Sequence, residues 1–170
     1  MSKGMEAIYT QVLSSSTSTV NFNNIPQTNT DLMIIASTRC DYAAIRISGA
    51  IRFNADASSL YSDTIFAGDG STPSSGRSQT NFSYLLETTG TSATANIFGS
   101  NTIYIPNYTS SMFKQYSSDC VSEHNGTNVN QTMYAGLYRS NAPITSITLF
   151  PGGGANFVTG STFTLYGISR

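Results

Sequence analysis

His124, the only histidine of the chain, is the side chain best suited to act as a general base. It follows Glu123 and lies near Asp119, and a histidine paired with a carboxylate can take a proton from a substrate. The next two residues, Asn125 and Gly126, are a strong hairpin-turn signal, so the pattern favours an exposed strand end over a catalytic pair. No nucleophile motif accompanies His124, and a single histidine disfavours a histidine-based metal site. We therefore predict that the protein is not an enzyme.

Two further patterns could hold a ligand. Asp56, Asp63 and Asp69 lie in a polar central region, and oxygen-rich loops can bind calcium, but they lack both a D-x-D-x-D spacing and a glutamate-terminated loop. The three glycines at 152–154 could cradle a phosphate only with a following helix and usually a lysine. Neither is present, so these glycines are predicted to be a flexible link between two strands. We expect no metal and no cofactor.

The two cysteines, Cys40 and Cys120, fit no metal-binding spacing. The first six residues lack the apolar core of a secretory signal, which predicts synthesis in a cytosol. Because disulfides are rare in that compartment, two buried free thiols are favoured over a disulfide across the core.

Composition narrows the class of protein. Charged residues are 10% of the 170 positions, against about 25% in an average soluble domain, and Ser, Thr and Asn take their place. The 10 Tyr and 9 Phe are enough to build a core. There is no basic run for nucleic acid and no apolar run of about 20 residues for a membrane. Hydroxyl and amide surfaces are less costly to desolvate than charged ones, which favours a protein that works in subunit contacts.

Short segments rich in β-branched and aromatic residues, bounded by Gly, Pro and Asn, predict eight or more strands and no helix. A bulge is expected near Gly49, another near Ser117 and Ser118, and a hairpin turn at Asn125-Gly126. The segments at 67–78 and 88–96 are predicted to be loops. The predicted strands are 6–12 and 18–22 as a first hairpin, 31–40, 43–54, 61–66, 82–87, 102–108, 112–123, 130–139, 144–150 and 161–168.

The predicted fold is an all-β, antiparallel β-sandwich of the jelly-roll type over residues 6–170, preceded by an N-terminal arm at 1–5. An up-and-down barrel is the alternative. In the last strand Phe163 and Leu165 should face the core, opposite Ile147 and Leu149, while the even positions, such as Tyr166, point to the other face. That second apolar face needs a cover, either another sheet or another subunit.

Four tyrosines lie in or beside predicted strands, and each is either half-buried core or part of an exposed surface. An exposed set could be a subunit interface or a platform on which sugars stack. The candidate interface residues are Met1, Ser2, Lys3 and Met5 of the arm together with Tyr104, Tyr108, Tyr134 and Tyr138.

Three segments resemble a known family. They are F-N-N-I-P-Q-T-N-T-D-L-M-I at 22–34, N-T-I-Y-I-P-N-Y-T-S-S at 101–111, and the C-terminal stretch that starts A-P-I-T-S-I-T-L-F-P-G-G-G at 142. Together they cover about a third of the chain, in the right order. They are similar to small virion structural proteins of tailed bacteriophages, many of them from marine and cyanobacterial phages.

This resemblance implies a non-enzymatic, jelly-roll-like building block on the exterior of the particle, made in the host cytoplasm and often a homotrimer. The implied role is a capsid cement or decoration protein that bridges major capsid proteins. The alternative is a module of a tail fibre or other appendage, or a glycan-binding module that attaches the particle to its host. The arm at 1–5 and the loops at 67–78 and 88–96 are the candidate contact regions.

Overall fold

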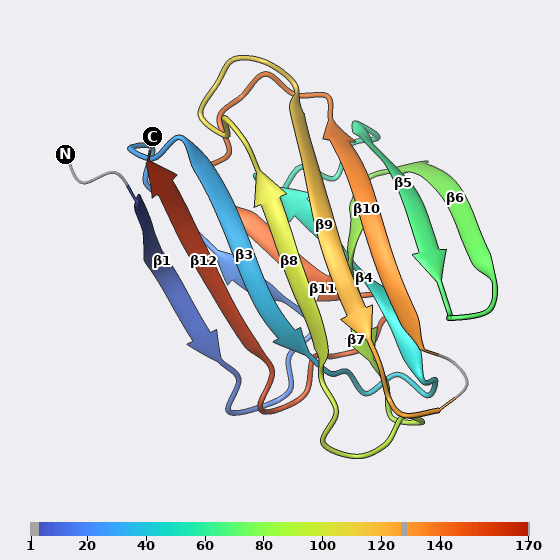
Figure 1. Ribbon diagram of the computed structural model, residues 1–170. Coiled ribbons are helices and arrows are strands. Elements are labelled where there is room, and N and C mark those ends of the chain that lie inside the picture. The colour runs from blue at the N-terminus through green and yellow to red at the C-terminus, as the bar shows by residue number, and fades with distance from the viewer. Residues whose placement is uncertain (1–3, 127–128, 170) are drawn as a thin grey trace.

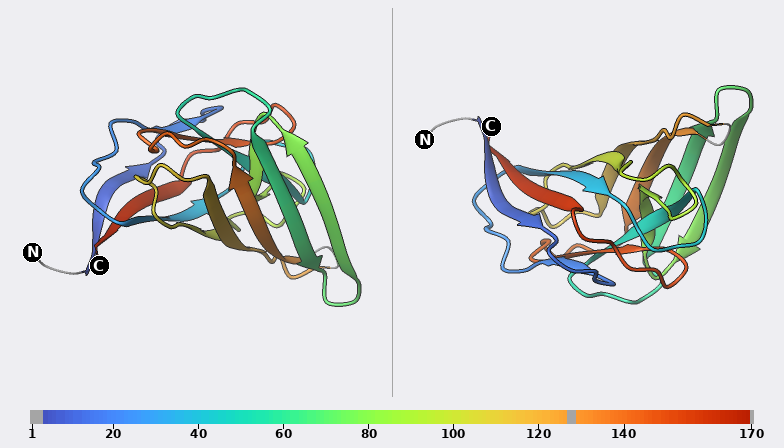
Figure 2. Two further views of the ribbon diagram at one scale, coloured as in Figure 1. Left: turned by 90° about the horizontal axis from the view of Figure 1, so that it is seen from above. Right: turned by 90° about the horizontal axis from the view of Figure 1, so that it is seen from below.

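The computed structural model describes residues 4–126 and 129–169, and this part of the chain contains twelve strands and no helix. The strands form two antiparallel sheets that pack face to face (Figure 1 and Figure 2). The eight-stranded sheet has the order β1 (Gly4–Val12), β12 (Thr162–Ser169), β3 (Asp31–Thr38), β8 (Gly99–Ile105), β9 (Lys114–Ser122), β10 (Asn130–Tyr138), β5 (Tyr61–Gly68) and β6 (Pro73–Thr80). The four-stranded sheet has the order β2 (Val20–Phe22), β11 (Ile147–Pro151), β4 (Arg46–Phe53) and β7 (Ser83–Thr89).

Eight of these strands follow the jelly-roll order, with β1-β12-β3-β8 in one sheet and β2-β11-β4-β7 in the other. The other four strands are two insertions, β5-β6 between β4 and β7 and β9-β10 between β8 and β11, and they extend the first sheet. The predicted jelly-roll-like sandwich is therefore confirmed. The up-and-down barrel is wrong, because strands adjacent in such a barrel are also consecutive in the chain.

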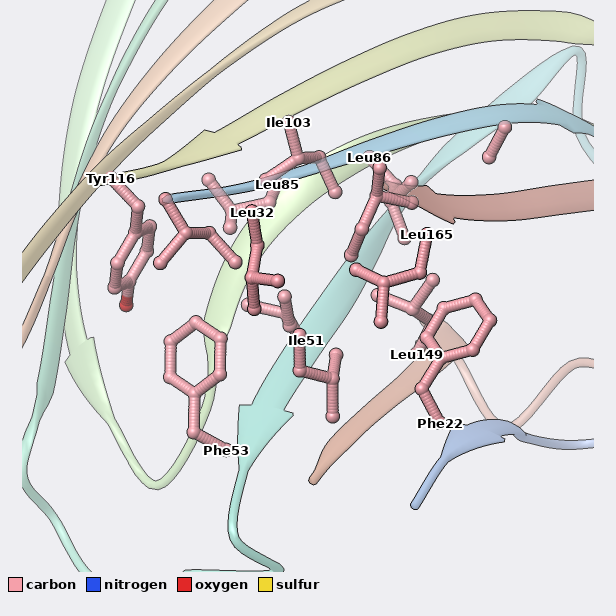
Figure 3. Close-up of a cluster of buried hydrophobic side chains, with 14 of the residues drawn as sticks. Phe22, Leu32, Ile51, Phe53, Leu85, Leu86, Ile103, Tyr116, Leu149 and Leu165 are labelled. Atoms are coloured by element: carbon pink, nitrogen blue, oxygen red, sulfur yellow. The ribbon is translucent and has the colours of Figure 1, made fainter. Parts of the chain in front are cut away.

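The core lies between the two sheets, where inward side chains of both interdigitate. Phe163 and Leu165 of β12 and Ile147 and Leu149 of β11 are all buried, which confirms the predicted faces of these two strands. The register shift between β4 and β7 at Gly49 confirms the predicted bulge. The labelled core residues of Figure 3 are Phe22, Leu32, Ile51, Phe53, Leu85, Leu86, Ile103, Tyr116, Leu149 and Leu165.

The predicted first hairpin is wrong. β1 pairs with β12 and β2 pairs with β11, so the two strands lie in different sheets and residues 13–19 cross between the layers. Short sequence separation favours a hairpin, but here each strand finds its partner at the far end of the chain. The predicted arm is also wrong in part, because Gly4 and Met5 already pair with Ser169 and Ile168. Residues 1–3 lie outside the described residues.

The predicted loop at 67–78 is largely a hairpin of β5 and β6. Its turn is stabilised by the Asp69 carboxylate, which accepts hydrogen bonds from the amides of Ser71 (2.9 Å) and Thr72 (2.6 Å). β6 is an edge strand with one partner, so its Pro and Gly interrupt no second ladder, and most of its side chains are exposed. Such a strand needs no apolar alternation, which is why its composition predicted a loop.

The predicted bulge near Ser117 and Ser118 is absent, since β9 pairs without a register shift with both of its neighbours. The alternation of apolar residues in this segment is interrupted because the inward positions of β9 include polar residues. The most polar of these is Lys114, which is almost fully buried. Its ammonium donates to the carbonyl oxygens of Ser110 (2.8 Å), Met112 (2.6 Å) and Ala142 (3.1 Å), so it ties two loops to the end of the strand. Burial lowers the pKa of Lys114, and these carbonyl contacts oppose the shift because they favour the charged form.

Both cysteines are buried and form no disulfide, which confirms the predicted free thiols. Burial raises the pKa of Cys40, and it raises that of Cys120 to about 12. Because the thiolate is the reactive form, we expect neither cysteine to react with an aromatic disulfide reagent in the native protein. Two equivalents per chain should react after unfolding in guanidinium chloride. Rapid reaction of the native protein would contradict the burial.

Candidate functional site

The outer face of the eight-stranded sheet, defined by the side chains that point away from the core, is open to solvent (Figure 2). Large apolar side chains are usually turned inward, yet several on this face are well exposed, including Phe66 at 58% and Met133 at 55%. They come from strands throughout the sheet, from β1 at one edge to β5 beside the other. The exposed large apolar residues of the outer face are Met5, Val12, Ile35, Phe66, Val121 and Met133.

The same face has few charges. Among its described outward positions, only Arg77 of β6 and Asp119 of β9 carry an exposed charge. A third carboxylate, that of Asp31, is buried at the start of β3 and accepts hydrogen bonds from the Tyr104 hydroxyl (2.8 Å) and the Asn107 amide (2.9 Å). The remaining outward positions are hydroxyl, amide, small or apolar side chains. Depletion of charge with exposed apolar groups is the pattern found at the core of protein interfaces.

Register places the apolar groups in line across the sheet. Phe66 pairs with Met133, which pairs with Asp119; Asp119 pairs with Thr102, and Thr102 pairs with Ile35. Apolar side chains therefore lie at both ends of one cross-strand row. Facing residues in such a row are near neighbours, so the row forms a continuous surface and not isolated exposed residues.

A neighbouring row forms a hollow of about 500 Å³. Thr64, Ala135 and Ser117 are aligned on three adjacent strands, and Tyr104 follows on the fourth. The three small side chains form a low floor between the taller Tyr104 and Arg77, which both line the hollow. The outer face is therefore shaped as well as sparsely charged.

The predicted tyrosine interface needs correction. Tyr108, Tyr134 and Tyr138 are buried in the core, and only Tyr104 reaches the outer face. Tyr138 stacks on Tyr61 with ring centroids 4.7 Å apart, so its ring fills space between the sheets. The sugar platform of Tyr104 with Tyr108 is likewise absent, because Tyr108 is fully buried and its hydroxyl donates to the Pro26 carbonyl.

Of the predicted arm contacts, Met5 lies on the outer face as part of β1, while Met1, Ser2 and Lys3 lie outside the described residues. Sequence reasoning missed Ile35, Phe66 and Met133. The available signal was an apolar residue on each face of the same strand, as at 31–40 and 130–139, which indicates a second face in need of a cover.

The other sequence candidates have structural roles. Asp63 is buried and accepts hydrogen bonds from Ser78, Ser83 and the Tyr84 amide, while Asp56 and Asp69 each bind side chains or amides of their own turns. Within residues 4–126 and 129–169, no three His, Cys, Asp or Glu side chains group as metal ligands would. His124 is half-buried just after β9, in the predicted turn.

The predicted flexible link at 152–154 is wrong, because these glycines form a closely packed turn. Gly153 and Gly154 have φ angles of 63° and 72°, in the left-handed region that favours glycine. A Cβ on Gly152 would lie 2.6 Å from the Ser48 carbonyl oxygen, and one on Gly153 would lie 2.5 Å from the Tyr42 ring. The turn after β11 is therefore tightly packed and needs these glycines.

The fold and the outer face define a class: a jelly-roll β-sandwich whose larger sheet has an open, sparsely charged outer face. No protein-family model matches the chain, and no curated protein matches it. The described part of the chain includes no helix that is long and apolar enough to span a membrane.

Proposed function

We propose that this protein is a virion structural protein of a tailed bacteriophage, a capsid decoration protein that binds the outside of the shell and stabilises contacts between major capsid proteins. The outer face of the eight-stranded sheet is the observation that carries this proposal. Its exposed apolar residues and its two exposed charges suit a permanent protein contact. The resemblance of the three sequence segments to phage virion proteins supports the choice of partner.

A decoration protein stabilises a shell by mass action, because it binds the assembled shell and not the dissociated subunits. Each copy needs an interface of roughly 1,000 Å² or more, and many copies add their effects. With Arg77 and Asp119 as the exposed charges, little of the binding free energy depends on ion pairs. Attachment should therefore change little between low and physiological salt, since screening acts on exposed charges.

The central test places a charge on the outer face. Ile35→Lys and Met133→Lys each put an ammonium group at an exposed apolar position near the middle of the face. We expect particle occupancy to fall at least tenfold for Ile35→Lys, because a buried lysine without a partner opposes association, and to fall less for Met133→Lys, whose ammonium group would lie beside Asp119. Unfolding free energy should change by less than about 0.5 kcal/mol, since both side chains are already exposed. Occupancy is measured by adding purified protein to particles that lack it and sedimenting them.

The control is Thr148→Lys, on the outward side of β11 in the four-stranded sheet. It adds the same charge on the opposite side of the molecule and should leave occupancy unchanged. Full occupancy of the Ile35→Lys and Met133→Lys variants would show that shell binding does not use the outer face. The homotrimer and the contacts of Met1, Ser2 and Lys3 belong to the same proposal, and the molecular mass in solution tests the trimer.

A further inference from the structure

A second hollow, of about 440 Å³, lies on the outward side of the four-stranded sheet, away from the face described above. In the register of this sheet Ala50 lies between Phe150 of β11 and Tyr84 of β7. A small residue between two aromatic ones leaves the sheet surface low at that point. The volume is in the range of small-molecule sites in proteins.

One wall of this pocket is an aromatic cluster. The Phe82 ring meets the Tyr84 ring edge-on, with centroids 5.2 Å apart, and meets the Phe150 ring in the same way at 5.6 Å. All three rings are half-buried and line the pocket, so each keeps part of its surface accessible. Accessible ring surfaces can pack against the C–H groups of a sugar ring.

Arg52 is the one charged residue among the described residues that line the pocket. Its guanidinium carbon lies 5.3 Å from the centroid of the Phe150 ring, and its Nε donates to the Asn81 carbonyl oxygen at 3.1 Å. These two contacts fix the orientation of the guanidinium plane. Its terminal nitrogens donate to no described residue. A fixed guanidinium with two open nitrogens is suited to bind a carboxylate with two parallel hydrogen bonds.

Other groups that line the pocket supply more donors. Gly153 and Gly154 line it, and the amide of neither donates to a described residue. The Ser18 and Tyr84 hydroxyls also line it and have no hydrogen bond within the described part of the chain. A purely apolar ligand would leave these groups unpaired, and a neutral sugar would bring no anion to the terminal nitrogens of Arg52.

We propose that this pocket binds an acidic saccharide, with the sugar ring against the aromatic cluster and its carboxylate on Arg52. The hydroxyl and amide donors of the rim then pair with the oxygens of the ring substituents. This site lies on the other sheet and does not depend on the proposed function. A protein that failed to bind capsids could still bind the saccharide, and the reverse also holds.

The test is a titration of ¹⁵N-labelled protein with galacturonic acid and with galactose, the matched neutral sugar, followed by NMR. Galacturonic acid should shift the amide signals of Gly153, Gly154 and Tyr84 and bind at least tenfold more tightly than galactose. Arg52→Gln should reduce binding of galacturonic acid at least tenfold, to the level of galactose. Arg77→Gln, on the other sheet, is the matched control and should change neither affinity.

A third arm uses acetate, which carries the carboxylate without the sugar ring. Equal affinity for acetate and galacturonic acid would overturn the proposal, because the pocket would then recognise only an anion. Equal affinity for galactose and galacturonic acid would overturn the role of Arg52. Absence of shifts at the pocket with a galacturonic acid oligomer would overturn the site itself.

Discussion

Replacing Phe163 with alanine is expected to lower the free energy of unfolding by about 3–5 kcal/mol. Phe163 is fully buried on β12, between β1 and β3, and its ring meets that of Phe157 edge-on with centroids 4.9 Å apart. Alanine would remove the burial of the ring and leave a cavity between the sheets. Because Phe157 comes from the loop before β12, the cavity would also loosen the packing of that loop.

Urea denaturation followed by tyrosine fluorescence measures this loss. Thr164→Ala is the matched control, because Thr164 is the next residue of the same strand and points to the outer face. It should change stability by no more than about 0.5 kcal/mol. A loss below about 1 kcal/mol for Phe163→Ala would mean that β12 turns its other face to the core.

The second large effect is expected from Arg46→Met, which removes the cation beside a fully buried carboxylate. Glu87 on β7 has no exposed surface, and its Oε2 accepts from Arg46 Nη1 at 2.9 Å. Its Oε1 accepts from the Tyr134 hydroxyl at 2.5 Å and from Ser48 Oγ at 3.1 Å, so the carboxylate joins both sheets. Burial and the nearby Glu87 charge raise the pKa of Tyr134, which keeps its hydroxyl a donor.

Without Arg46 the Glu87 charge is left buried with only neutral donors. We expect the free energy of unfolding to fall by about 3 kcal/mol, at the lower end for a broken buried pair because Arg46 is one-third exposed. Adding Glu87→Gln to Arg46→Met should recover part of the loss, since it removes the unpaired charge. Arg77→Met is the surface control. Thermal unfolding is compared for the unmodified protein, Arg46→Met, the double variant and Arg77→Met. Equal melting temperatures for Arg46→Met and Arg77→Met would contradict a structural role for the Arg46–Glu87 pair.

Local patterns predicted the class of fold well. Alternation in the segment that became β12 identified both the strand and its buried face, because side chains in a strand alternate between the two sides whatever the partner. The bulge at Gly49 was predictable for the same reason: a glycine interrupts the alternation there. These features depend on neighbouring residues only.

Pairing partners were not predictable in this way. β1 pairs with β12 and β2 with β11, over separations that span most of the chain. The edge strand β6 was not predictable either, since it has the composition of a loop and is a strand because β5 supplies its hydrogen bonds. Such contacts are decided by the packing of the whole sandwich and leave little trace in a local pattern.

β10 shows most directly that a local pattern does not decide which face of a strand is buried. The alternation at 130–139 separates Met133 from Tyr134 and Tyr138, but both faces are apolar, so the pattern left the tyrosines open to either the core or an exposed interface. In the structure the tyrosines fill the core and Met133 is exposed. Only the position of β10 relative to the opposite sheet decides between the two orientations.

The sequence by itself determined that this protein is all-β and sparsely charged, because strand alternation and composition are properties of neighbouring residues and of the chain as a whole. The tertiary structure decided which side chains share one exposed face. Phe66, Met133 and Ile35 form one row only because four pairings bring β5, β10, β9, β8 and β3 side by side. A sheet surface is built from residues far apart in the chain, so it exists only once the strands have paired.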